Sequence, residues 1–200
     1  MSKKKLLRNL EKQGIPKKII NAFEKTNRKK FITTEQEVNA HLDIPIPIGH
    51  MQTTSQPYTI AFMLTLLEVE NKQKILEIGS GSGYVLELLS KLNPEGKIIG
   101  IERIKELADK SQATLQNQKN IKIINKNAMQ GLKNNKEVFD RILISAECEK
   151  IPQKVVNQLK IKGVMIAPVR GSLIKLKKES GENQILKYPG FSFVPLINTK

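Results

Sequence analysis

The chain has 200 residues, and its hydrophobic content of 39% is enough for one domain with a buried core. It has no run of about 20 apolar residues that could span a bilayer, and its basic N-terminus lacks an apolar signal segment, so we expect a cytoplasmic protein with no membrane partner. The net charge of +15 invites a nucleic-acid function. Because the basic runs are scattered and only 4% of the residues are aromatic, we expect no specific nucleic-acid partner. We also expect a monomer.

Helical and strand patterns alternate along the chain. Apolar residues at helical spacing predict helices at residues 4–12, 16–25, 57–68, 83–92, 104–117 and 152–159. Short apolar runs predict strands in the order "KILEIG", "GKIIGIE", "IKIIN", "VFDRILIS", "GVMIAPV", "SLIKLKK" and "FSFVPLI". This order predicts an α/β fold, with a doubly wound, mostly parallel sheet, an N-terminal helical extension and antiparallel strands at the C-terminal end.

A run of hydroxyl and amide side chains precedes the third predicted helix, within "PIPIGHMQTTSQPYTIAFML". Pro57 suits the first turn of that helix, and we expect Ser55 to be its N-cap. A capped helix start does not explain the other members of the run, which are Gln52, Thr53 and Thr54.

A glycine-rich turn follows the first predicted strand, and it is made by Gly79, Ser80, Gly81, Ser82 and Gly83. Glycine lets such a turn reach positive φ and lets a ligand approach the backbone closely. The second strand ends in Glu102, whose carboxylate can accept both hydroxyls of a ribose. The carboxyl ends of these strands therefore predict a nucleotide site.

The residues around the turn favour S-adenosyl-L-methionine over other nucleotides. The P-loop pattern is absent, and Tyr84 stands where a dinucleotide fingerprint needs its third glycine. Glu77, inside the strand, would repel phosphates but suits a ligand with a cationic amine and a sulfonium. The two histidines, His41 and His50, are too few for a metal site, so we expect no metal.

The chain resembles the protein-L-isoaspartate (D-aspartate) O-methyltransferase family. The similarity extends from about residue 6 to residue 197 and includes the segment around Ser55 together with "ILEIGSGSGY", "IERIKELA", "FDRILISA", "IPQKVVNQLK" and "FSFVPLI". The resemblance implies methyl esterification of isoaspartyl, and in some cases D-aspartyl, residues in damaged proteins and peptides, which starts repair through a succinimide. It also implies the fold of class I S-adenosylmethionine-dependent methyltransferases.

The resemblance also implies roles for individual residues. Ser55 corresponds to the family's catalytic serine, and the other predicted substrate residues are Gln52, Thr53, Thr54, Ser145 and Ala146. The predicted cofactor residues are Glu77, Gly79, Ser80, Gly81, Gly83, Glu102, Asn127 and Ala128. We expect residues 1–56 to form N-terminal helices and a cap over the active site, and residues 57–200 to form the methyltransferase domain, effectively as a single unit.

Several positions depart from the family pattern. Asn127 replaces the acid that usually faces the adenine amine, and Arg170 stands where the family has glycine. Glu147, Cys148 and Glu149 replace a small turn with proline that lines the substrate site. Carboxylates there would repel an anionic substrate unless they point away.

Two alternatives remain open from the sequence. The segment "FDRILISAEC" resembles a motif of RNA cytosine-C5 methyltransferases, although the second cysteine that those enzymes carry is absent. Since neighbouring carboxylates raise a thiol pKa, we interpret Cys148 as a structural residue. A relative that binds the cofactor but has reduced or lost catalysis is the other alternative.

Overall fold

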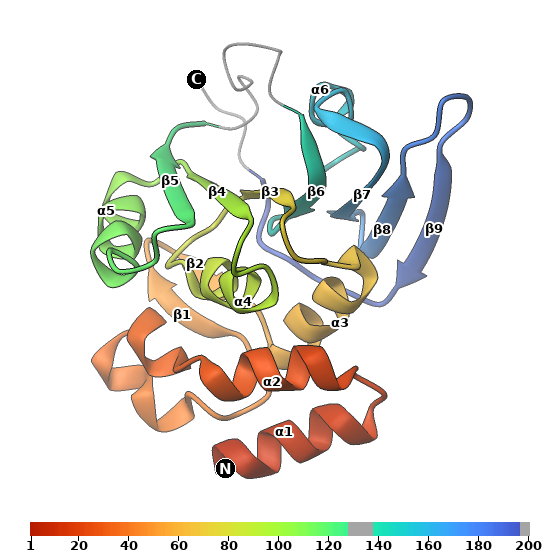
Figure 1. Ribbon diagram of the computed structural model, residues 1–200. Coiled ribbons are helices and arrows are strands. Elements are labelled where there is room, and N and C mark those ends of the chain that lie inside the picture. The colour runs from red at the N-terminus through yellow and green to blue at the C-terminus, as the bar shows by residue number, and fades with distance from the viewer. Residues whose placement is uncertain (128–137, 197–200) are drawn as a thin grey trace.

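The computed structural model describes residues 1–127 and 138–196. Its centre is a seven-stranded sheet with the strand order β5-β4-β3-β6-β7-β8-β9 (Figure 1). The strands are β3 (Lys74–Ile78), β4 (Lys97–Glu102), β5 (Ile121–Asn125), β6 (Phe139–Ile144), β7 (Leu159–Val169), β8 (Ser172–Lys177) and β9 (Gln184–Pro189). Neighbours from β5 to β7 pair in parallel, and β7, β8 and β9 pair antiparallel. The predicted fold class is confirmed.

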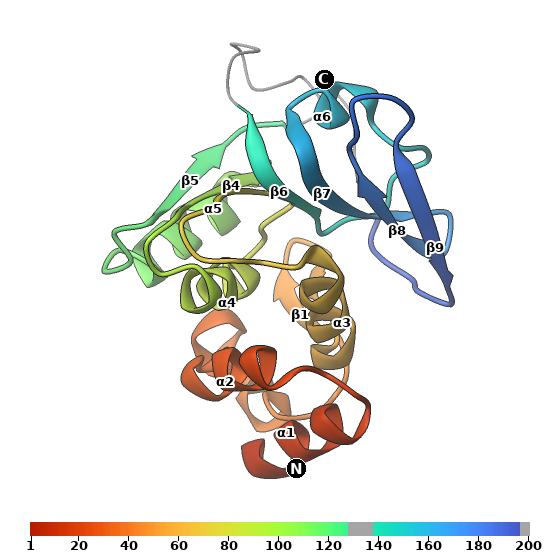
Figure 2. The same cartoon turned by 45° about the vertical axis from the view of Figure 1, so that its right-hand side comes forward.

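Helices cover the sheet and extend away from it on one side. They are α1 (Lys3–Lys12), α2 (Lys17–Lys25), α3 (Pro57–Leu67), α4 (Tyr84–Leu92), α5 (Lys105–Thr114) and α6 (Gln153–Val156). Helices α3 and α4 pack between the sheet and the outer helices α1 and α2 (Figure 2). A small hairpin of β1 (Ile46–Gly49) and β2 (Gln52–Thr54) lies between α2 and α3 in the sequence.

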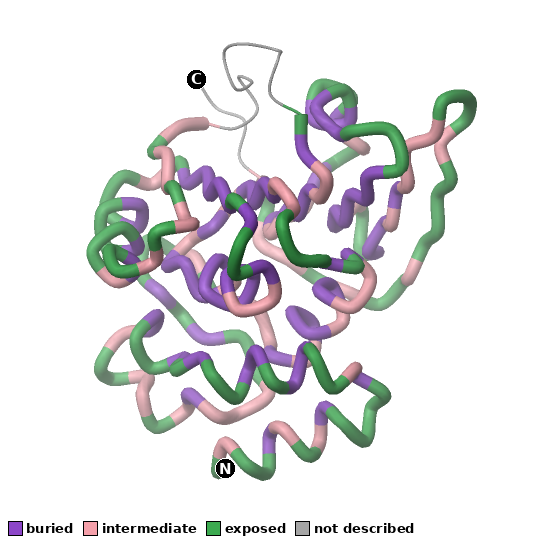
Figure 3. The backbone as a smooth tube through the Cα atoms, in the orientation of Figure 1, coloured by how far each residue is buried: buried purple, intermediate pink, exposed green. Residues whose placement is uncertain are grey.

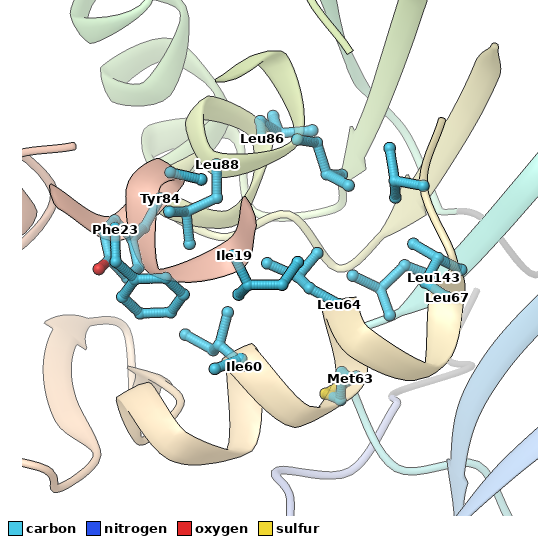
Figure 4. Close-up of a cluster of buried hydrophobic side chains, with 14 of the residues drawn as sticks. Ile19, Phe23, Ile60, Met63, Leu64, Leu67, Tyr84, Leu86, Leu88 and Leu143 are labelled. Carbon is cyan, nitrogen blue, oxygen red and sulfur yellow. The ribbon is translucent and has the colours of Figure 1, made fainter. Parts of the chain in front are cut away.

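Alternate residues of the central strands are buried on both faces of the sheet, as parallel strands require. On one face Ile75, Ile98 and Leu143 join a core with α2, α3 and α4, whose side chains meet in Figure 4. On the other face Leu76 and Ile142 pack with α6. Figure 3 shows this burial concentrated in the sheet and in the inner faces of the helices. Within the described residues, no helix is long and apolar enough to cross a membrane.

The start of α3 differs from the prediction. Gln56, not Ser55, is the N-cap residue, and its side chain makes no capping hydrogen bond. The carboxylate of Asp43 instead accepts from the backbone N–H of Tyr58 at 2.8 Å. A residue distant in sequence therefore caps the helix in place of the Ser55 side chain. Pro57 lies in the first turn of the helix, as predicted.

The prediction of "FSFVPLI" as the C-terminal strand is also wrong. Among the described residues the last strand is β9, and residues 191–196 form only an isolated bridge beside Glu147. The backbone N–H of Glu147 donates to Val194 at 2.8 Å, and that of Leu196 donates to Glu147 at 2.7 Å. Pro195 has no N–H for a longer ladder. Helix α6 is shorter than predicted because β7 begins at Leu159.

Candidate functional site

The carboxyl ends of β3, β4 and β6 lie at one edge of the sheet, where the glycine turn follows β3. The backbone φ angles are 77° at Gly79, 52° at Gly81 and 90° at Gly83. The Gly79 N–H donates to the carbonyl of Ile101 on β4 at 2.9 Å. At Gly83 a Cβ would lie 2.8 Å from Leu115. The turn therefore needs glycine both for its dihedral angles and for its close approach to the neighbouring segment.

Glu102 ends β4 and holds the turn in place. Its Oε2 accepts from the N–H of Gly81 and its Oε1 accepts from the N–H of Ile104, both at 2.8 Å. Glu102 is 7% exposed. Because a carboxylate oxygen accepts more than one hydrogen bond, Glu102 can fix the turn and bind a ligand hydroxyl at the same time.

Glu77 is a buried carboxyl group with one oxygen available to a ligand. The hydroxyl of Ser145 donates to its Oε1 at 2.7 Å. Its Oε2, like the hydroxyl oxygen of Ser80, is buried without a hydrogen-bond partner among the residues that the structure describes. Burial raises the pKa of Glu77 to about 8, the Ser145 hydrogen bond acts against that rise, and the charge of Glu102 adds to it. A cationic ligand group would supply the missing partner and favour the ionised carboxylate.

The hydroxyl-rich segment forms the β1–β2 hairpin beside this edge. Ile46 pairs with Thr54 and Pro47 pairs with Thr53 in an antiparallel register. His50 and Met51 form the turn, with φ of 53° and 55°. Alternation along β2 buries Thr54 and leaves Thr53 accessible. The hairpin thus presents Thr53 toward the space beside the sheet edge.

A buried arginine fixes the end of this segment. Arg28 is only 2% exposed. Its guanidinium donates to four main-chain carbonyls, those of Ala40, Leu42, Ile44 and Ser55, at 3.5, 3.1, 3.0 and 3.0 Å. Its carbon atom lies 5.8 Å from the ring centre of Tyr84, the first residue of α4. Arg28 therefore couples the position of Ser55 to the helix that follows the glycine turn.

Three adjoining hollows surround the hairpin. The inner pocket includes Glu77, Ser80, Ser82, Thr54, Ile60 and Met63 in its lining. The outer pocket includes Gln52, Glu102, Arg103, Asn127, Ala146 and Leu196. The surface cleft includes Pro45, Gln56, Tyr58, Phe191, Ser192 and Phe193.

Shared residues connect these three hollows. Thr53 lines all of them, and Ser55 lines both the inner pocket and the surface cleft. Gly79, Gly81 and Ser145 line both the inner and the outer pocket. A ligand that fills the inner and outer pockets would therefore contact a second ligand, bound in the surface cleft, and the contact would lie beside Thr53 and Ser55.

The structure brings nearly all of the predicted site residues together. Those that line at least one hollow are Gln52, Thr53, Thr54, Ser55, Glu77, Gly79, Ser80, Gly81, Glu102, Asn127, Ser145 and Ala146. Gly83 is instead the N-cap residue of α4, and Ala128 lies outside the described residues.

Sequence reasoning missed Arg28, Asp43 and the wall of the outer pocket formed by residues 194–196. Arg28 was hidden in the basic run 28–30, and the sequence offers no signal that it is buried. Pro195 did give a signal against a regular strand.

Glu147, Cys148 and Glu149, which depart from the family pattern, line none of the three hollows. The carboxylate of Glu147 accepts from the N–H of Gly171 at 2.6 Å, and exposed Glu149 lies 3.9 Å from Arg170. Cys148 is 5% exposed, and burial, with the charge of Glu147, raises the pKa of its thiol to about 11. The two acids therefore bind the β7–β8 turn rather than face the hollows.

Comparison with known proteins places these features in a family. The model of the protein-L-isoaspartate(D-aspartate) O-methyltransferase family matches residues 1–200. A protein-L-isoaspartate O-methyltransferase of Fervidobacterium nodosum is 39% identical over 186 residues, which are 90% of this chain and 93% of that protein. One from Methanococcoides burtonii is 34% identical over 199 residues, with 96% and 98% covered.

Solved structures agree with the sequence comparisons. A Plasmodium falciparum protein described as a protein-L-isoaspartate O-methyltransferase, in complex with S-adenosyl-L-homocysteine, superposes with a TM-score of 0.86. It is 27% identical, and the match covers 98% of this chain and 99% of that one. A precorrin-6y C5,15-methyltransferase from Geobacter metallireducens, 21% identical with a TM-score of 0.52 over 70% of this chain and 87% of that one, shares the fold alone.

Proposed function

The chain belongs to the protein-L-isoaspartate(D-aspartate) O-methyltransferase family, and we propose that its three connected hollows hold the cofactor and substrate of that reaction around Ser55. The enzyme transfers a methyl group from S-adenosyl-L-methionine to the free carboxylate of isoaspartyl residues in damaged proteins. The observation that carries the site assignment is the position of Thr53, which lines all three hollows, with Ser55 between the inner pocket and the cleft.

The residues of the inner and outer pockets fit the cofactor. The unpartnered Oε2 of Glu77 suits the cofactor's ammonium group, which would replace the proton that burial favours. Glu102 would accept the ribose hydroxyls while it holds the turn. Asn127, and Ala128 beyond the described residues, would lie at the adenine. When bound, the cofactor supplies a methyl group activated by its sulfonium.

Ser55 and its neighbours would position the attacking carboxylate. The substrate enters through the surface cleft, where the Ser55 hydroxyl would donate to one carboxylate oxygen and leave the other free to attack. Attack needs that oxygen about 3–3.5 Å from the methyl carbon and in line with the sulfur. Thr53, Thr54 and Gln52 would shape the space and keep water out, together with Ser145 and Ala146. A buried cation at this place would weaken the nucleophile, whereas hydroxyls do not.

The products of the transfer account for repair. The carboxylate oxygen gains the methyl group, the carbon–sulfur bond breaks, and S-adenosyl-L-homocysteine leaves. The neighbouring backbone nitrogen then attacks the ester carbonyl and expels methanol, so that a succinimide forms. Water opens this ring to a mixture of isoaspartyl and normal aspartyl residues. Repeated cycles convert damaged residues to normal ones.

We propose further that the chain acts as a cytoplasmic monomer without a nucleic-acid partner. In this proposal residues 1–56 supply the N-terminal helices and the active-site cap of what is effectively a single domain. The raised thiol pKa of Cys148 supports a structural role, because an RNA cytosine-C5 methyltransferase needs a thiolate nucleophile. The uncommitted oxygen of Glu77 supports an intact cofactor site rather than a degenerate relative.

The test is transfer of a labelled methyl group from S-adenosyl-L-methionine to three acceptors in parallel. We expect labelling of an isoaspartyl peptide, and little labelling of the same peptide with normal aspartate or of bulk RNA. Labelling of the RNA alone would overturn the proposed function, as would the absence of transfer to the isoaspartyl peptide by a folded protein that binds the cofactor.

A further inference from the structure

Aromatic side chains gather on one side of the surface cleft. The whole chain has six phenylalanines and three tyrosines, and four of these nine rings form one connected stack. Phe62 is its centre: its ring centre lies 6.0 Å from Tyr58, 5.5 Å from Tyr188 and 5.6 Å from Phe191. The Phe62 and Phe191 rings are within 7° of parallel, and Tyr188 meets Phe62 edge to face at 84°. A chain with few aromatic residues thus places a group of them together.

The stack joins two elements that are distant in sequence. Tyr58 and Phe62 lie on α3, whereas Tyr188 is in β9 and Phe191 follows it. In Figure 1 the chain turns back from the end of β9 past α3. All four residues are only partly buried, so each keeps accessible surface. Partly exposed, rigid aromatic side chains are typical of the anchor points of protein interfaces.

The stack is continuous with the proposed substrate site. Tyr58 and Phe191 line the same cleft as Ser55 and Thr53. An extended peptide advances about 3.3–3.6 Å per residue, and Tyr58 comes only three residues after Ser55. A polypeptide with its isoaspartyl residue at Ser55 therefore brings neighbouring side chains onto the aromatic stack.

The cleft offers no charge to a substrate. Its described lining consists of proline, glycine, valine, aromatic, hydroxyl and amide residues, with no Lys, Arg, Asp or Glu among them. This is unexpected on a chain with a net charge of +15. Contact with residues that flank the isoaspartate must therefore depend on apolar surface and hydrogen bonds rather than on ion pairs.

Resting on the proposed function, we propose that the stack of Tyr58, Phe62, Tyr188 and Phe191 is a subsite for the polypeptide beside the damaged residue. It favours substrates that carry an aromatic or large apolar side chain within a few residues of the isoaspartate. Such sequences belong to buried segments of folded proteins, so the subsite directs the enzyme toward unfolded or partly unfolded damaged chains.

A peptide series tests this inference with the unmodified enzyme. Each peptide carries one isoaspartyl residue among serines and glycines, and a single phenylalanine is moved from about four residues before it to about four residues after it. An aromatic contact is worth enough to change binding by roughly tenfold. We expect kcat/KM to rise by about that factor at one or two positions. Equal values at every position would overturn the inference, while no methylation of any peptide would overturn the proposed function itself.

Variants separate a subsite from a purely structural cluster. Phe191→Ala should lower kcat/KM for the best phenylalanine peptide by about tenfold more than it lowers kcat/KM for the serine and glycine peptide without phenylalanine. Leu186→Ala is the matched control, because Leu186 is an apolar side chain of β9 that is 55% exposed and outside the cleft. It should leave both peptides unchanged. An equal loss on both peptides in Phe191→Ala would assign the stack to folding and overturn the inference.

Discussion

Cofactor binding should release a proton from Glu77, which makes affinity depend on pH. Glu77 is 1% exposed, and burial raises the pKa of its carboxyl group to about 8. The free enzyme therefore holds it mostly protonated at neutral pH. The cofactor's ammonium group needs the ionised form, so the proton must leave on binding. Because the pKa of this acid is raised, affinity should improve as the pH rises toward 8 and weaken as it falls.

The size of the effect follows from the fraction of ionised Glu77. With a pKa of about 8, about 1% of the free enzyme is ionised at pH 6 and about a quarter at pH 7.5, so the apparent affinity should rise by about twentyfold. An α-amino group with a pKa of about 7.7–8.0 stays mainly charged over this range. Calorimetry in buffers of different ionisation enthalpy measures both the affinity and the released proton.

Two controls isolate the carboxyl group from the rest of the site. Glu77→Gln keeps the shape and can still accept from Ser145, and its cofactor affinity should be lower and nearly independent of pH. A ligand that has the adenosyl part but no amino acid, such as methylthioadenosine, should bind the unmodified enzyme without proton release. An equally steep pH dependence for Glu77→Gln, or for this ligand, would refute the assignment of Glu77 to the ammonium group.

Other substitutions test the remaining parts of the site. Ser55→Ala should retain cofactor affinity but slow methyl transfer by about 10²–10³-fold; equal rates would leave Ser55 without a catalytic role. Gly81→Val should abolish cofactor binding in calorimetry, because φ is 52° and an added Cβ would lie 3.0 Å from Ile48, and unchanged affinity would contradict this. Arg28→Met should lower the free energy of unfolding by about 3 kcal/mol or more in urea titration, since four carbonyls lose their donor; a loss below about 1 kcal/mol would contradict the role of Arg28. Cys148→Ser should keep methyl transfer within a few-fold of the unmodified rate, and complete loss in a folded variant would support a catalytic role for the Cys148 thiol.

The fold was predictable because its signals are local. Apolar runs such as "KILEIG" alternate with helical spacing, and the glycine turn occurs where a strand meets a helix. Parallel strands then bring the ends of β3 and β4 to one edge, so Glu77 and Glu102 could be assigned to one site from the sequence. The carboxyl ends of β3, β4 and β6 meet in this way whatever the details of the loops.

Features that depend on long-range contacts were not predictable. Ser55 has the residue type and spacing of an N-cap, but Asp43 caps the helix by accepting from the N–H of Tyr58, fifteen residues later in the chain. Arg28 looked like one cation in a basic run, although it is buried against four carbonyls. Glu147 looked like a repulsive carboxylate beside the substrate, although it accepts from Gly171 and lies outside the hollows. In each case the partner is chosen by tertiary packing, which local patterns do not encode.

The most direct test of the enzyme's role follows a single isoaspartyl peptide over time by mass spectrometry and chromatography. With S-adenosyl-L-methionine present, we predict that the methyl ester appears first, the succinimide next, and the normal aspartyl peptide accumulates over repeated cycles. Without the cofactor none of these should form at a comparable rate. If folded enzyme with bound cofactor leaves the isoaspartyl peptide unchanged, or methylates its normal aspartyl twin equally well, the repair function is contradicted.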